Sequence, residues 1–186
     1  MNERPPVFTI GHSTRTIEEF IALLEREGVR HLVDVRRFPA SRRYPHFNSE
    51  SLRASLNAAG ISYDHVPAMG GRRSTNAASR NVGWRNASFR GYADHMDSAE
   101  FQQALDALIA TSAHVPTTVM CAEAVPWRCH RTLIADALLA RGVSVRHILD
   151  AATKDHVLTR FGIIVNGRVR YPDEQGEDLF SAAETS

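Results

Sequence analysis

The stretch VMCAEAVPWRCHRTLIADALLARG, residues 119–142, joins an apolar strand to a helix through one short turn. Its first residues continue the apolar run that begins at Thr117, and Pro126 marks the turn. Its last part has the apolar spacing of a helix that ends at Gly142. A strand that leads directly into a helix is the unit from which parallel sheets are built, so this stretch predicts an α/β fold.

The rest of the chain repeats this alternation of strands and helices. Strands are predicted at residues 7–13, 31–36, 61–66, 117–123 and 143–149. Helices are predicted from the capping-box spacing of Thr16 and Glu19 to Gly28, from about Asn48 to Gly60, from Asp97 onward, and over residues 129–141. Residues 68–88 are rich in Gly, Arg, Asn and Ser, and they are interpreted as one long loop that is functional or mobile.

This order predicts a single three-layer α/β domain over residues 1–172, with a mainly parallel sheet and helices on both faces. Asn166-Gly167 lies between two β-prone runs and predicts a C-terminal hairpin. Residues 173–186 form an acidic tail that we expect to be solvated or disordered. No second domain and no internal repeat is indicated.

The composition is that of a soluble globular protein. Of 186 residues, 43% are apolar and 23% are charged, which excludes wholesale disorder. No apolar run approaches the ~18 residues of a membrane helix, and the polar start MNERPP does not resemble a secretory signal. We therefore expect a cytoplasmic protein without a membrane partner, whose two cysteines remain thiols.

The net charge of +1 conceals a strongly basic segment between Arg36 and Arg90. Ten arginines stand there against only two carboxylates, Glu50 and Asp64. Aromatic residues are interleaved with these arginines, as in proteins that track a nucleic-acid backbone and stack on bases. The segment predicts a phosphate-bearing partner, either a small molecule or a nucleic acid.

Polar residues follow the predicted strands at the point where each strand ends. Open parallel sheets bind ligands beyond the carboxyl ends of their strands, so these residues should lie close together. They are His12 and Ser13, Asp34 and Arg36, Tyr63 and His65 leading to Gly70-Gly71, Cys121 and Glu123, and His147.

Asp34 and Glu123 each follow an apolar run, where a buried carboxylate without a partner is unfavourable by several kcal/mol. Two interpretations remain open for both. Arg36, Arg131, His12 or a backbone amide pairs with the carboxylate in a structural role, or the carboxylate takes part in proton transfer or holds a sugar hydroxyl.

The thiols of the 119–142 stretch fit no standard sulfur motif. A phosphatase or rhodanese loop has Cys-x5-Arg with glycines, whereas six residues without glycine separate Cys121 from Arg128. Seven residues separate Cys121 from Cys129, in place of the two of a dithiol redox motif. A zinc site of Cys121, Cys129, His130 and His147 is disfavoured, because adjacent Cys129 and His130 fit poorly around one tetrahedral ion. Cys129 is the better candidate for covalent chemistry, and Cys121 is expected to be a buried thiol.

Anion binding fits the stretch better. Cys129, His130 and Arg131 fall in the first turn of the predicted helix, whose free N–H groups favour a negative ligand. An arginine at this position is explained by a neighbouring carboxylate, such as that of Glu123, or by a ligand phosphate.

The sequence also resembles a known family in six blocks, which are TIGHS, LVDVRRFPASRRYPHF, GISYDHVPAMGG, FRGYADHM, CAEAVPWRCHR and VRHIL. In this order they resemble the signature blocks of domain-of-unknown-function family 488 (DUF488) over residues 7–150. The resemblance implies a compact α/β domain, and it leaves the reaction open. It also implies a shared site built from His12, Ser13, Asp34, Arg36, Gly70, Gly71, Glu123, Cys129, His130 and Arg131.

Three functional hypotheses follow. In the first, an enzyme holds a nucleotide or similar phosphate-bearing molecule at the carboxyl rim of the sheet, with His12, Ser13, Arg36, Gly70, Gly71, Cys129 and Arg131 as ligand-binding residues. Glu123, Asp34 and His130 then supply acid–base chemistry, without a metal or another cofactor. The second is a non-catalytic nucleic-acid-binding module that uses the basic 36–90 segment. The third is a thiol-dependent redox or sulfur-transfer protein that uses Cys129.

Overall fold

A six-stranded sheet forms the centre of the molecule in the computed structural model, which describes residues 4–173. Its strands are β1 (Val7–Gly11), β2 (His31–Asp34), β3 (Ser62–His65), β4 (Thr117–Cys121), β5 (Val145–Ile148) and β6 (Thr153–Asp155). They follow the order β3-β2-β4-β1-β5-β6. The first five in this order are parallel, and β6 pairs antiparallel with β5. The prediction of a mainly parallel α/β sheet is confirmed.

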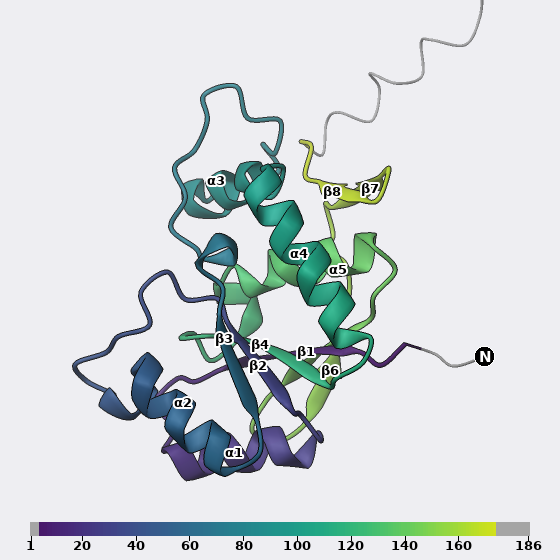
Figure 1. The fold of residues 1–186 in the computed structure, drawn as a ribbon. Coiled ribbons are helices and arrows are strands. Elements are labelled where there is room, and N and C mark those ends of the chain that lie inside the picture. The colour runs from purple at the N-terminus through teal and green to yellow at the C-terminus, as the bar shows by residue number, and fades with distance from the viewer. Residues whose placement is uncertain (1–3, 174–186) are drawn as a thin grey trace, which may run out of the picture.

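Helices cover both faces of this sheet (Figure 1). They are α1 (Ile17–Arg26), α2 (Ser49–Ala58), α3 (Ala87–His95), α4 (Ala99–Ser112) and α5 (Arg131–Ala140). Because neighbouring strand residues point to opposite faces, Leu32 packs with α1 and α2, whereas Val33 packs in the cluster of α4 and α5. None of the helices in the described part of the chain has the length and apolarity that a membrane span requires.

Helix α3 is the one regular element near the site that the sequence analysis does not predict. Its apolar residues have helical spacing, but Gly91 among them weakens the signal. Asn86 caps its start by accepting from the backbone N–H groups of Ser88 and Phe89. The predicted 68–88 loop therefore ends at Asn86 and begins after the 3₁₀ turn η2 (Pro67–Met69).

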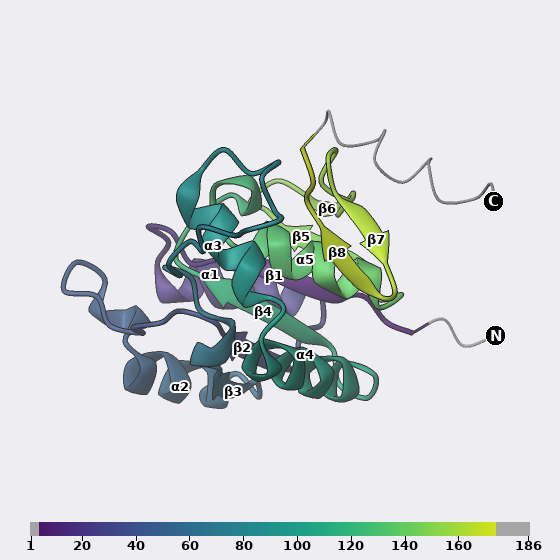
Figure 2. The same ribbon diagram turned by 90° about the horizontal axis from the view of Figure 1, so that it is seen from above.

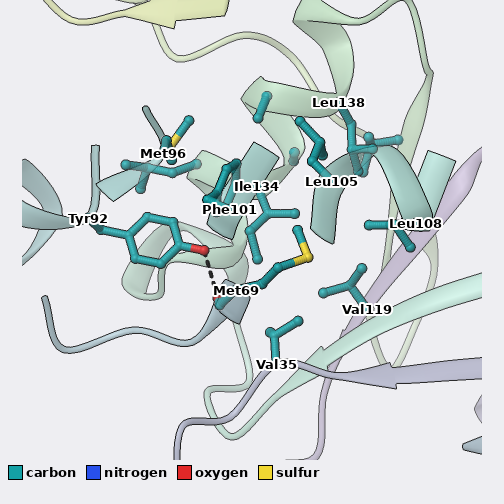
Figure 3. Packing of buried hydrophobic residues seen from close by; sticks show 14 of the residues in the cluster. Val35, Met69, Tyr92, Met96, Phe101, Leu105, Leu108, Val119, Ile134 and Leu138 are labelled. Carbon is teal, nitrogen blue, oxygen red and sulfur yellow. Dashed lines mark hydrogen bonds between the residues drawn. The ribbon is translucent and has the colours of Figure 1, made fainter. Parts of the chain in front are cut away.

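The two ends of the 70–86 segment are held together inside the core. Figure 3 shows Tyr92 of α3 among apolar side chains that include Phe101 and Ile134. Its hydroxyl donates a 2.7 Å hydrogen bond to the carbonyl of Met69. The 70–86 segment therefore leaves the core and returns to it at neighbouring points, and the bond between Tyr92 and Met69 holds these two points together.

The predicted C-terminal hairpin is confirmed. Strands β7 (Ile163–Val165) and β8 (Arg168–Arg170) are joined by Asn166 and Gly167, whose φ angles of 51° and 71° suit a two-residue hairpin turn. The hairpin lies beside α5 (Figure 2). Apart from Asp173, the predicted acidic tail lies outside the described residues.

Asp136 fastens the C-terminal region to α5. Its carboxylate is completely buried and accepts hydrogen bonds from the hydroxyls of Tyr171 (2.7 Å) and Thr159 (2.6 Å), and from the Thr159 amide. His156 Nε2 lies 2.8 Å from the same carboxylate, and its Nδ1 lies 2.9 Å from Nε2 of His147 on β5. One buried side chain thus connects a helix, a loop and the hairpin.

Asp136→Ala is expected to lower the free energy of unfolding by about 3–5 kcal/mol, because it leaves several buried donors without an acceptor. Urea denaturation measures this change. Asp106→Ala is the matched control, since Asp106 pairs with Arg141 on the surface and should matter by less than about 1 kcal/mol. Equal effects of the two substitutions would contradict the anchoring role of Asp136.

Candidate functional site

An open pocket of about 1000 Å³ lies beyond the carboxyl ends of β1, β2 and β4. Its walls come from residues 12–14, 36–44, 71–72 and 121–130, together with Asn86 and helix α3. Figure 1 shows the segments after β2 and after η2 on the same side of the molecule. The pocket is thus at the edge where open parallel sheets bind ligands.

His12 and Ser13 continue β1 into the pocket. Their amides donate 2.9 Å hydrogen bonds to the carbonyls of Cys121 and Ala122, so the pairing with β4 extends past the end of the strand. His12 Nδ1 donates to the Ser13 carbonyl, and Nε2 faces Arg36 Nη1 at 3.4 Å. Burial and the charge of Arg36 lower the pKa of His12 to about 4, so the ring is neutral and Nε2 is an acceptor.

Asp34 is the last residue of β2, and its side chain lies behind the pocket wall and does not line the pocket. The carboxylate is completely buried and receives Arg36 Nε and Nη2 at 2.9 and 2.6 Å, as well as the Tyr63 hydroxyl at 2.8 Å. Burial and the Asp34 charge raise the pKa of Tyr63, which keeps this phenol a donor. Of the two interpretations open for Asp34, the geometry fits structural pairing, which orients Arg36.

Arg131 is likewise buried behind the pocket. Its Nη2 donates to the carbonyls of Glu123 and Ala124, its Nε donates to Cys121 Sγ at 3.0 Å, and its Nη1 lies 3.4 Å from Thr9 Oγ1. No exposed surface remains on this side chain. The arginine therefore interacts with the backbone of Glu123, and not with the carboxylate or with the space that a ligand would occupy.

The loop between β4 and α5 passes so close to β1 that Gly11 is required there. A Cβ atom on Gly11 would lie 1.7 Å from the Glu123 carbonyl oxygen. The Glu123 side chain is exposed on the pocket wall. Among the described residues that line the pocket, it is the one carboxylate.

Cys121 and Cys129 are in contact at the floor of the pocket, with 2.7 Å between their sulfur atoms. The Arg131 amide at the start of α5 donates to Cys129 Sγ at 3.4 Å, and His130 Nδ1 lies 3.8 Å from it. Burial by itself would raise the pKa of Cys129, but the hydrogen bonds from Cys121 and His130 and the charge of Arg131 lower it well below its ordinary value. Burial and the bond to Cys129 raise the pKa of Cys121. Deprotonation is therefore easier at Cys129 than at Cys121.

His130 is held in a narrow slot. Its ring packs against Tyr92, with 5.0 Å between the ring centroids, and a Cβ atom on Gly71 would lie 2.8 Å from its Nδ1. Gly71 is therefore the residue that leaves room for this ring. His130 Nε2 is buried and has no hydrogen-bond partner among the described residues. Such an atom is well suited to bond a ligand.

Four further arginines line the pocket, which are Arg37, Arg43, Arg72 and Arg128. Within residues 4–173, none of their guanidinium groups has a carboxylate partner. Phe38, Tyr44 and Phe89 add aromatic surface. The sequence marks Arg37, Arg43 and Arg72 only as members of the basic 36–90 segment, and it marks Arg128 only by its spacing from Cys121. The position of Arg128 directly before Cys129 is the signal that could have identified it as a pocket residue.

The structure divides the predicted site residues into two groups. The residues that line the pocket are His12, Ser13, Arg36, Gly71, Glu123, Cys129 and His130. Asp34, Arg131 and Gly70 lie behind it, where the Gly70 carbonyl accepts from Arg73 Nε at 3.0 Å. His65 bonds the carbonyl of Arg36, and His147 contacts Thr9 and His156 away from the pocket. In the described part of the chain, no group of three or more His, Cys, Asp or Glu side chains is placed to hold a metal ion.

A family model described as Domain of unknown function DUF488 matches residues 16–138. This match confirms the family resemblance, and it includes every residue of the shared site that the resemblance implies except His12 and Ser13. No curated protein and no solved structure matches the chain.

Lowering the pH from 6.5 to 4 is expected to destabilise the fold through His12 and His147. Burial first, and then the charges of Arg36 and His156 respectively, lower the pKa of each imidazole to about 4. In the unfolded chain both bind protons near pH 6.5, so the stability present above that pH is lost as the pH falls towards 4. The free energy of unfolding should decrease by up to about 1.4 kcal/mol per pH unit for each imidazole.

Urea denaturation at a series of pH values measures this decrease, and NMR of the ring protons identifies the two histidines. A stability profile that stays flat over this pH range, or a midpoint near 6.5 for either ring, would be inconsistent with their burial as neutral groups.

Proposed function

The chain belongs to the DUF488 family, whose description leaves the activity open, and we propose from its pocket that it is an enzyme acting on a phosphate-bearing small molecule of nucleotide size. Arginines hold the phosphate, and Glu123 and His130 supply acid–base chemistry. The unpaired positive charge around the pocket is the observation that carries this proposal.

Five arginines line the pocket together with one carboxylate, that of Glu123, and four of these arginines have no carboxylate partner within residues 4–173. A planar guanidinium donates two parallel hydrogen bonds to a phosphate, and each such charged bond stabilises a complex by about 1.5–3 kcal/mol. Cations arranged in this way repel one another until an anion binds between them. A volume of about 1000 Å³ accommodates a nucleotide and is large for inorganic phosphate alone.

The aromatic side chains favour a nucleotide over a simple sugar phosphate. Phe38 is 67% exposed at the pocket, which is unusual for a phenylalanine, and the Arg37 guanidinium lies 5.7 Å from its ring centroid. Phe89 and Tyr44 lie in other parts of the wall. A nucleobase has a flat face that can stack on such rings.

Glu123 and His130 are the groups best placed for proton transfer. The Glu123 carboxylate is exposed in the pocket, and His130 Nε2 is buried without a partner. We assign Glu123 as the general base and His130 as the group that donates to, or accepts from, the reacting part of the substrate. Asp34 is already engaged by Arg36 and Tyr63, so its role becomes that of a positioning residue.

Single-stranded nucleic acid is the second candidate ligand. Exposed Phe38 beside Arg37, within a segment that carries ten arginines, favours it. In that case binding depends on many arginines across the surface, and it weakens steeply with salt. Arg80 and Arg85 distinguish the two candidates, because both are exposed in the basic segment and neither lines the pocket.

Arg72→Ala and Arg128→Ala are expected to weaken the binding of mononucleotides and pyrophosphate by about ten- to a hundredfold, because each removes a charged hydrogen bond. Isothermal titration calorimetry measures the affinities. Arg80→Ala and Arg85→Ala are the matched controls and should bind like the unsubstituted chain. If all four variants lose affinity equally, and mainly for DNA or RNA oligonucleotides, the nucleic-acid alternative is correct.

Glu123→Gln is expected to retain ligand binding and to lose turnover, because the amide preserves shape but cannot accept the proton. Phosphorus NMR and chromatography of a panel of nucleotides incubated with the chain detect the reaction. Glu50→Gln, on the exposed side of α2, is the control. Turnover that survives in Glu123→Gln would refute the assignment of the base.

A further inference from the structure

Cys121 and Cys129 form an unequal pair of thiols at the floor of the pocket. Their sulfur atoms are 2.7 Å apart, although seven residues separate them in sequence and one lies at the end of a strand. The Arg131 amide at the start of α5 donates to Cys129. The Arg131 guanidinium donates to Cys121. Each sulfur therefore has its own donor from the same arginine, and either can carry negative charge.

The two thiols differ in how easily they lose a proton. Cys129 Sγ accepts from a helix N-terminus and lies near His130, and its pKa is lowered although burial opposes this. Cys121 lies on β4 and keeps its proton, because burial raises its pKa. This arrangement provides a nucleophilic thiolate together with a protonated neighbour within bonding reach.

We propose that Cys121 and Cys129 are a redox-active dithiol that reduces an anionic small-molecule disulfide in the pocket. The Cys129 thiolate attacks one sulfur of the disulfide, forming a Cys129–substrate mixed disulfide and releasing the other half as a thiolate. Cys121 then loses its proton to solvent and attacks Cys129 Sγ. The Cys121–Cys129 disulfide forms, and the second half of the substrate leaves as a thiolate. Two electrons pass from the protein to the substrate.

The buried charge of Arg131 makes this disulfide easy to reduce again. In the dithiol state the Cys129 thiolate neutralises a guanidinium that has no exposed surface. In the disulfide state this counter-charge is lost, and the buried cation is left with neutral partners. The stabilised thiolate favours the reduced form and raises the reduction potential of the pair, so the pair reduces only disulfides that are themselves strongly oxidising, such as aromatic disulfides that release low-pKa thiolates. An external dithiol can therefore regenerate the pair.

The pocket determines the charge of the substrate. The sulfur atoms are reached through a cavity that five arginines and one carboxylate line, so a negatively charged disulfide is attracted and a neutral one is not. This activity is independent of the acid–base roles of Glu123 and His130 proposed above, since it needs no proton transfer from either.

The experiment mixes the reduced chain, under native conditions, with the dianionic aromatic disulfide 5,5′-dithiobis(2-nitrobenzoate). The unsubstituted chain should release both aromatic thiolates from each molecule of reagent, and its intact mass should show an internal disulfide without an adduct. Cys121→Ser should release one thiolate and keep the other half on Cys129. Cys129→Ser should not react until it is unfolded. A stable adduct on the unsubstituted chain, or reaction of the unsubstituted chain only after unfolding, would overturn the proposal.

A second arm tests the charge preference with uncharged 2,2′-dithiodipyridine. Arg72→Ala or Arg128→Ala should slow the reaction with the anionic reagent by about three- to tenfold more than the reaction with the neutral reagent. Arg85→Ala, outside the pocket, should alter neither rate. Equal rates of all variants with both reagents would overturn the assignment of an anionic substrate. Circular dichroism confirms that each variant is folded, and nucleotide binding by Cys129→Ser, measured separately, tests the phosphate pocket alone.

Discussion

The buried guanidinium of Arg131 is the interaction on which the site depends. A cation without any exposed surface is tolerated only when every donor finds an acceptor, and this one reaches two carbonyls, a thiol sulfur and a threonine hydroxyl. These acceptors come from β1, β4 and the loop that follows β4. The arginine thus holds the loop against the sheet, and Gly11 makes the close approach possible.

A buried ion pair between Arg36 and Asp34 supports the pocket wall that follows β2. Arg36 binds both oxygens of Asp34, which also accepts from Tyr63 on β3. Asp34, which the sequence predicts to be catalytic, and Arg131, which it predicts to bind the ligand, are both buried and paired within the fold. The groups that line the pocket beside these pairs are the Glu123 carboxylate, the His130 ring and the largely buried Cys129 thiol. The buried charges of Asp34, Arg36 and Arg131 therefore support the pocket, and the groups proposed to act on a ligand line it.

The two activities that we propose both depend on the start of helix α5. The first amide of α5 donates to Cys129 Sγ, and His130 follows Cys129 in the chain. The arginines above them come from loops after β2, after η2 and before α5. The proposed phosphate ligand and the proposed disulfide substrate would occupy the same pocket, so the binding of one is expected to exclude the other.

The sequence by itself determined the α/β class, the capping box of α1, the hairpin turn at Asn166-Gly167, and the set of strand ends at which polar residues gather. These features depend on local spacing, which a linear pattern records directly. It did not determine which residue of each polar group points into the pocket. Only the tertiary structure decided that Asp34 and Arg131 are buried, that Glu123 is exposed, and that Cys121 contacts Cys129. The reason is physical, because burial and pairing depend on how β1, β4 and α5 approach one another, and no spacing along the chain encodes that distance.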